Sequence, residues 1–425
     1  MARHLVIQLA RFGDIVQTKR LLLSLAATPG DEVHLAVDGS LAPLARTLYP
    51  FAVVHAIRAH ASGAGAAEIF AHNREAFASL AAADFTSVYT LNFSGMAFAL
   101  AGLFDPDSLR GYTRRKGQDL RSSWLRMGFR WMGDRRIAPL NLVDFWAYLH
   151  ADPIPPDKVN PEASDRRQGK IAIVAAGRES RRSLPAQVLA PLVEAIFAAR
   201  GGPEIVILGS NAERPFAHRL ARLLRPAVLQ KVDDACGRTA LTDLPAILSE
   251  CDMALTPDTG VMHLAAHLGV PVRAFFLSSA WCFETGPYGA GHTVFQSTRP
   301  CAPCVETRPC PCNAQCLAPF AEPGLAAAVR ETEGQPLREN PPWPEGLALL
   351  RTRLDAFGCD YVPVRGGFAE LPRRKALRAL LAEFTGRGDG RDAAAWCADT
   401  VFHETDWMLP PPAMDYGAPQ PRGRE

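Results

Sequence analysis

The chain has 425 residues, more than one hydrophobic core usually organises, so we expect two or three domains. Hydrophobic residues make up 48% and charged residues 21%, which is a globular composition. The net charge is only +2, which argues against a protein that binds polyanions over its whole surface. The apolar runs near the N-terminus are too short for a signal peptide or a membrane span, so we expect a cytoplasmic protein.

The first part of the chain alternates strand-like and helix-like segments. Apolar or alternating runs that predict strands occupy 4–10, 32–37, 52–57 and 87–92. Helix-like segments such as 16–27 and 65–83 lie between them. This alternation predicts parallel βαβ units and an N-terminal domain of residues 1–155. Four prolines and many polar residues then mark 151–170, where we place a linker at 156–169.

The same alternation restarts after the linker and predicts a second α/β domain over residues 170–325. Its expected strands are 170–176, 204–209, 252–256 and 271–276. Its expected helices are 184–200, 214–226 and 261–269. Beyond residue 325 the pattern becomes irregular, and we expect helices near 345–357, 371–386 and 392–402. Residues 326–425 are therefore predicted to form a helical extension with a disordered tail.

Two strand-to-helix turns carry small polar residues. In LTPDTGVMHLAAHLGVP (255–271), Asp258, Thr259 and Gly260 stand between an apolar strand and a helix. Helix N-termini at this edge of a parallel sheet suit phosphate, and Gly260 would let a ligand approach the backbone. The simpler interpretation is that Asp258 only caps the helix. In the other turn, Gly13 and Asp14 offer either a helix cap or a cleft carboxylate that can accept a proton.

A local block of positive charge lies in the first domain. Residues 110–136 carry nine Lys or Arg against two Asp, and Trp124, Phe129 and Trp131 are interleaved with them. Such a block attracts phosphate groups or anionic lipid, or it is simply a solvated basic surface. No nucleic-acid-binding motif accompanies it, so we expect no nucleic acid partner.

Five of the ten cysteines gather in one proline-rich segment, at Cys301, Cys304, Cys310, Cys312 and Cys316. Four thiolates can hold zinc tetrahedrally, but this spacing lacks the paired C-x2-C form that identifies zinc sites well. The pattern leaves a structural zinc and a compact loop of reduced thiols both open, with an iron–sulfur cluster less favoured.

Several segments between about residues 3 and 320 resemble the heptosyltransferase-like glycosyltransferases of family nine. The similar segments are GDIVQT (13–18), NLVDFWAYL (141–149), AAGRESRRSLP (175–185), DTGVMHLAAHLGVP (258–271) and CAPCVETRPCPCNAQC (301–316). The resemblance implies a GT-B fold, in which two Rossmann-like domains face each other across a cleft. It implies inverting transfer of heptose, or a related sugar, from ADP-heptose to a lipid-linked lipopolysaccharide core acceptor, with no metal required for transfer. A cytoplasmic protein that binds peripherally to the inner membrane would follow.

The resemblance also implies roles for single residues. Asp14 matches the catalytic base, and Gly13 with Arg114, Arg115 and Lys116 falls on the acceptor side. The implied donor residues are Arg182, Glu213, Asp258, Thr259, Gly260 and His263. Each of these roles has a simpler interpretation. His263 is then a packed histidine, which we expect to be its main role, and Glu213 is an exposed glutamate at the start of a helix. Residues 178–182 would be a solvated basic loop.

The chain departs from the family pattern next to one of these residues. Arg182 stands where the family has Lys, and Leu184-Pro185 stands where it has Trp-Pro. Two alternatives to a transferase stay open, and these departures favour the second of them. One is a nucleotide-sugar epimerase on the same fold, and the other is a non-catalytic nucleotide-sugar binding module.

Overall fold

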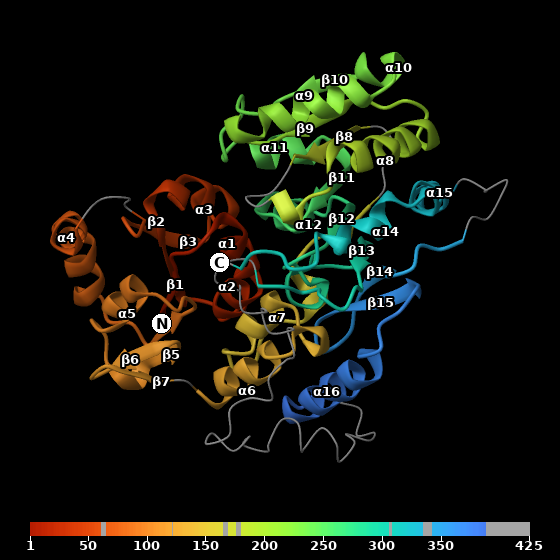
Figure 1. The fold of residues 1–425 in the computed structure, drawn as a ribbon. Helices are drawn as coiled ribbons and strands as arrows, with labels where there is room; N and C mark the ends of the chain where they lie inside the picture. The colour runs from red at the N-terminus through yellow and green to blue at the C-terminus, as the bar shows by residue number, and fades with distance from the viewer. Residues whose placement is uncertain are drawn as a thin grey trace, which may run out of the picture.

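The computed structural model of the chain describes residues 1–60, 65–120, 122–164, 169–175, 180–305, 308–334 and 342–387. Two separate sheets dominate these residues, one parallel and one mostly parallel, and each is covered by helices (Figure 1). The alternation of strands and helices in the sequence is thus confirmed. No helix in this part of the chain is long and apolar enough to cross a bilayer.

The first sheet is parallel and has the strand order β3-β2-β1-β4-β5. Its strands are β1 (Arg3–Gln8), β2 (Glu32–Asp38), β3 (Ala52–Ile57), β4 (Ser87–Thr90) and β5 (Leu109–Gly111). The helices of this domain are α1 (Phe12–Gln17), α2 (Lys19–Leu25), α3 (Ala42–Leu48), α4 (Ala66–Ala82), α5 (Gly95–Ala101), α6 (Ser123–Met132) and α7 (Leu142–Ala147). The single helix expected over 16–27 is instead two helices, α1 and α2, which meet at Thr18. At this break the Thr18 hydroxyl donates a hydrogen bond to the Ile15 carbonyl.

The second sheet has eight strands in the order β10-β9-β8-β11-β12-β13-β14-β15. Its strands are β8 (Lys170–Val174), β9 (Ile205–Leu208), β10 (Val232–Asp234), β11 (Cys251–Pro257), β12 (Val272–Phe276), β13 (Thr293–Ser297), β14 (Leu347–Leu354) and β15 (Cys359–Arg365). Its helices are α8 (Ala186–Ala199), α9 (Arg214–Leu223), α10 (Pro226–Leu229), α11 (Leu244–Ser249), α12 (Gly260–His267), α13 (Cys282–Thr285), α14 (Ala318–Ala321) and α15 (Pro323–Thr332).

The C-terminal region corrects one prediction and confirms another. The helix expected near 345–357 is wrong, because these residues form β14, which pairs antiparallel with β13 and β15. A short Leu-rich run cannot be assigned to helix or strand by periodicity, and pairing with the open edge of the sheet decides it. The helix expected over 371–386 is confirmed as α16 (Leu371–Phe384). The helix expected over 392–402 and the tail lie outside the described residues.

Helix α16 leaves the second sheet and returns to the first domain (Figure 1). The Arg374 guanidinium donates to the Ala138 carbonyl at 2.9 Å, and Arg378 donates to the Pro139 carbonyl at 2.8 Å. Both arginines are buried. The C-terminal region therefore contacts both domains: β14 and β15 extend the second sheet, and α16 binds the first domain.

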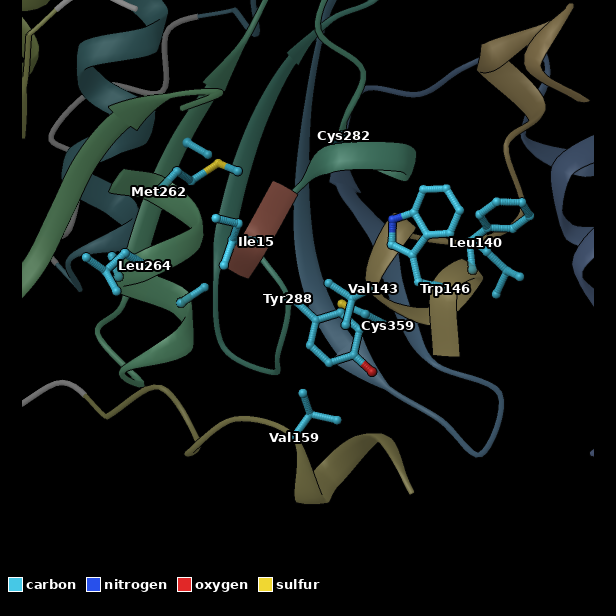
Figure 2. Close-up of a cluster of buried hydrophobic side chains, with 14 of the residues drawn as sticks. Ile15, Leu140, Val143, Trp146, Val159, Met262, Leu264, Cys282, Tyr288 and Cys359 are labelled. Carbon is cyan, nitrogen blue, oxygen red and sulfur yellow. The ribbon is translucent and has the colours of Figure 1, made fainter. Parts of the chain in front are cut away.

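The hydrophobic core also crosses between the domains. Ile15 of α1 lies beside Met262 and Leu264 of α12 in one buried cluster (Figure 2). The same cluster contains Val143 and Tyr288, which come from opposite sides of the linker. Burial of apolar surface thus holds the two domains in one relative position.

A buried ion pair supports this junction. The Arg20 guanidinium lies 2.5 Å from the Asp144 carboxylate, and both side chains are fully buried. The same carboxylate accepts the Tyr288 hydroxyl at 2.6 Å and the Cys359 backbone N–H at 2.8 Å. Asp144 therefore joins α2 and α7 to two segments of the second domain.

Candidate functional site

A cleft of about 1470 Å3 opens between the two sheets. From the first domain, the turn after β1 contributes Gly13 and Asp14 to its wall. From the second domain, the turn after β11 contributes Asp258, Thr259 and Gly260. Both turns follow the carboxyl ends of parallel strands, where open α/β sheets bind ligands. The two turns singled out in the sequence therefore meet at one site.

The two turns meet through their glycines. A Cβ on Gly260 would lie 2.2 Å from Phe12 Cδ1, and one on Gly13 would lie 3.1 Å from His263 Cδ2 and 3.3 Å from Gly260 Cα. The space beside Gly260 is thus filled by Phe12 of the first domain. We expected the missing side chain of Gly260 to leave room for a ligand, and the structure corrects this, because Phe12 occupies that space. It allows α1 and α12 to approach closely.

Asp14 combines the two roles that the sequence left open. It is the third residue of α1, and its carboxylate accepts the Arg11 backbone N–H at 3.0 Å, as an N-terminal cap does. The same residue lines the cleft. Burial raises the pKa of the Asp14 carboxyl, opposed by the Arg11 N–H and the Arg11 charge and reinforced by Asp258. A carboxylate of raised pKa at a cleft wall is suited to accept a proton.

The helix cap in the second turn is Thr259 and not Asp258. The Thr259 hydroxyl accepts the Met262 backbone N–H at 3.3 Å and lies 3.1 Å from the Thr256 hydroxyl. This frees Asp258 from the capping role that the simpler interpretation assigned to it. The start of α12, with its unpaired N–H groups, faces the cleft.

Asp258 instead organises three side chains around it. Its carboxylate accepts one hydrogen bond from the Arg182 guanidinium and another, at 3.1 Å, from the Thr285 hydroxyl. His263 Nε2 lies 3.8 Å from its other oxygen. Burial lowers the pKa of His263 to about 4, although Asp258 opposes the shift, so the imidazole is neutral near pH 7. The expectation of a packed histidine is met, and Arg182 is brought into the cleft wall.

Glu213 lies at the start of α9, on the second-domain wall of the cleft. Its carboxylate accepts the Ser210 backbone N–H at 2.7 Å and the Ser210 hydroxyl at 2.6 Å. This capping box shows that the residue has a local structural role. The residue is half-buried and lines the cleft.

The second domain matches a known family. Residues 159–314 match the model of glycosyltransferase family 9 (heptosyltransferase). We call the second domain, which contains most of this matched segment, the family 9 domain. Lipopolysaccharide heptosyltransferase 1 of Pseudomonas aeruginosa is 37% identical over 98 residues, which are 23% of this chain and 26% of the relative. The matched segment thus spans about a quarter of the length of this curated relative.

Solved structures extend the likeness to both domains. E. coli ADP-heptose lipopolysaccharide heptosyltransferase II superimposes with a TM-score of 0.53 at 17% identity, covering 69% of this chain and 90% of that one. A family 9 glycosyltransferase from Veillonella parvula gives 0.54 at 17%, covering 70% and 87%. E. coli heptosyltransferase WaaC with ADP gives 0.53 at 17%, covering 69% and 93%. At this identity the likeness establishes the fold, and the expected two-domain GT-B architecture is confirmed.

The cysteine cluster lies at one end of the family 9 domain. Cys301 and Cys304 line the cleft, and Cys310 accepts the Ala314 backbone N–H at 3.4 Å. Burial raises the pKa of Cys301 to about 11, so it is a neutral thiol near pH 7. Within the described residues, no group of three or more His, Cys, Asp or Glu side chains is arranged to hold a metal ion. The donor set as placed does not fit zinc, and a structural zinc stays a prediction that metal analysis of the purified protein would check.

The acceptor residues expected from the basic block lie away from the cleft. Arg114, Arg115 and Lys116 form part of an exposed hairpin of β6 (Thr113–Arg115) and β7 (Gln118–Leu120). Arg114 pairs with Asp119 at 2.7 Å and lies over the Phe98 ring. None of the three is among the described residues that line the cleft. Position in sequence could not show this, because the hairpin turns the block outward.

Sequence reasoning missed several cleft residues. Two of them, Arg135 and Arg136, stand at the end of the basic block. Arg135 pairs with Glu284 of the family 9 domain at 2.5 Å, and Arg136 pairs with Glu370 at 2.8 Å. Glu370 comes from the C-terminal region. Gln17 also lines the cleft. The one available signal was the three-residue spacing of Asp14 and Gln17, which puts them on one side of α1.

Proposed function

We propose that this protein is an inverting glycosyltransferase that moves a sugar from a nucleotide-diphosphate donor to an acceptor hydroxyl. The carrying observation is that Asp14 of the first domain faces the Asp258–Gly260 turn of the family 9 domain across one cleft. A half-buried carboxylate on one wall and unpaired helix N–H groups on the other are the two groups that such a transfer needs.

Asp14 would take the proton from the acceptor hydroxyl as its oxygen attacks the anomeric carbon of the donor sugar. The sugar–phosphate bond breaks on the opposite side, so a single displacement inverts the configuration. Negative charge then grows on the leaving diphosphate. The N–H groups at the start of α12, the Thr259 hydroxyl and the nearby Arg182 guanidinium would stabilise that charge.

The donor proposal is ADP-heptose or a related ADP-sugar. A structure of E. coli heptosyltransferase WaaC that has this fold was solved with ADP, which supports an ADP-containing donor. We place the nucleotide in the family 9 domain. Glu213 lines the cleft of that domain and is the residue that we assign to the nucleoside. The acceptor proposal is a lipid-linked lipopolysaccharide core saccharide, which the first domain would receive.

A lipid-linked acceptor requires contact with a membrane surface, and we propose the β6–β7 hairpin for it, at the cytoplasmic face of the inner membrane. Arg115 and Lys116 are exposed there, with Leu120 44% exposed and the nearby Phe93 50% exposed. Basic and apolar side chains together favour anionic bilayers. We expect sedimentation with phosphatidylglycerol vesicles to fall in an R115E/K116E variant and to persist in the exposed control R222E. If both variants sediment equally well, the hairpin does not contact the membrane.

The function is tested by measuring ADP release from ADP-heptose with and without a heptose-deficient lipopolysaccharide acceptor. Acceptor-dependent release is the expected result. Donor conversion to another sugar without acceptor would establish an epimerase instead. ADP binding with no turnover under either condition would leave a binding module, for which the departures at Arg182 and Leu184 are the sequence features in favour.

A further inference from the structure

One arginine of the first domain holds a segment of the opposite cleft wall. The Arg135 guanidinium donates to the Glu284 carboxylate at 2.5 Å and to the Ser279 carbonyl at 2.8 Å. Arg135 and Ser279 both line the cleft, and Glu284 is buried. The contact therefore crosses from the first domain to the family 9 domain beside the space that a donor would fill.

The contact continues from Glu284 into the proposed diphosphate site. Glu284 is followed by Thr285, and both residues lie in α13. The Thr285 hydroxyl donates to the Asp258 carboxylate at 3.1 Å, and the same carboxylate oxygen accepts the Arg182 guanidinium. Arg182 also donates to the Asp258 backbone carbonyl at 3.2 Å. A continuous run of contacts thus joins Arg135 in one domain to Arg182 in the other.

This run can control where the Arg182 guanidinium points. The Asp258 oxygen that binds Arg182 is also held by the Thr285 hydroxyl, so a shift of α13 moves Asp258 and, with it, Arg182. A displacement of about 1 Å in a group that contacts a substrate can cost a factor of about 100. Holding α13 in place therefore matters for a charged ligand at Arg182.

The charge of Glu284 gives Arg135 a second effect that must be told apart from the first. Burial raises the pKa of the Glu284 carboxyl, opposed by Arg135 and reinforced by Asp258. Glu284 thus lies close enough to Asp258 for their charges to interact. Arg135 neutralises a carboxylate near the proposed diphosphate site, and it also fixes the position of α13.

We propose that Arg135 is a positioning residue of the donor site, which acts through Glu284 and Thr285 on Asp258 and Arg182. This inference rests on the proposed function, because Arg182 is a group that we assign to the leaving diphosphate. It adds that donor binding depends on the first domain, since full affinity for ADP requires the two domains to be in contact at Arg135. Coupling between distant sites can be carried by such chains of hydrogen bonds and ion pairs.

The test measures ADP binding to the full chain by isothermal titration calorimetry. R135M breaks the run at its first-domain end, and we expect ADP to bind about tenfold more weakly. T285V breaks it in the other domain and should have a similar effect, whereas R135K and T285S should each recover part of the affinity. R135M/T285V should bind no more weakly than either single variant, because both changes break the same run. The exposed variant R126M is the matched control and should behave as wild type.

A second double variant separates position from charge. R135M leaves the buried Glu284 carboxylate unpaired near Asp258, and that charge alone would repel a diphosphate. R135M/E284Q removes both charges but does not restore the contact between the domains. We expect this variant to keep the weak ADP binding of R135M. Full recovery of ADP affinity would show that Arg135 only neutralises Glu284, and the inference would be wrong.

Other results would also overturn the inference. These are wild-type ADP affinity in R135M or in T285V, or losses from the two changes that add in the double variant. Chemical denaturation of each variant checks stability, and a loss of affinity that appears only in a partly unfolded variant would count against a positioning role. A wild-type chain that does not bind ADP would overturn the donor proposal itself and this inference with it.

Discussion

Replacing Asp14 by Asn is expected to lower acceptor-dependent ADP release by a factor of about 100 or more. The amide has nearly the same shape and can still accept the Arg11 N–H that caps α1, but it cannot take a proton. ADP binding should be unchanged, because the proposed donor groups lie in the other domain. The exposed variant D157N is the control and should keep full activity.

The pH dependence of wild-type activity and the stability of D14N provide two further readouts. Burial raises the pKa of Asp14, so wild-type activity should be lost as the pH falls through a value above that of an ordinary aspartate. A carboxyl with a raised native pKa contributes stability below its unfolded pKa, and this is lost as the pH rises through the native pKa. D14N should therefore be as stable as the wild type or more stable near pH 7. Release that survives in D14N would place the base elsewhere, and a large fall in stability would point to a structural role.

Replacing Asp144 by Asn is expected to lower the free energy of unfolding by about 3–5 kcal/mol. The variant leaves the fully buried Arg20 guanidinium without its counter-charge and weakens the bonds from Tyr288 and Cys359. Because these partners come from both domains, we expect the loss to appear in chemical denaturation of the whole chain. The exposed Arg3–Glu32 pair offers a matched control, and E32Q should change stability little.

A double variant separates charge from packing at the same site. R20M/D144L removes both charges, and replacing a buried pair with apolar residues often restores stability. We expect it to recover a large part of the loss seen in D144N. If D144N alone unfolds at the wild-type denaturant concentration, the ion pair does not hold the domains together and the apolar cluster around Ile15 and Met262 carries that role.

The strand and helix pattern was available from local sequence. Segments such as 32–37 and 252–256 are recognisable as strands because strands of a covered parallel sheet are short, largely apolar runs. Neighbours along the chain set that pattern. The positions of Asp14 and Asp258 followed from the same rule, since ligand-facing turns come after such strands. The sequence by itself therefore determined two α/β domains and the two turns that carry the site.

Contacts between distant residues decided the rest. Residues 347–354 are a strand only because β13 offers an open edge, which no local pattern shows. Gly260 is small because Phe12 fills the space beside it, and Arg182 faces the cleft because Asp258 holds it there. These features depend on which side chains meet after folding, and sequence spacing sets that only within one helix or strand.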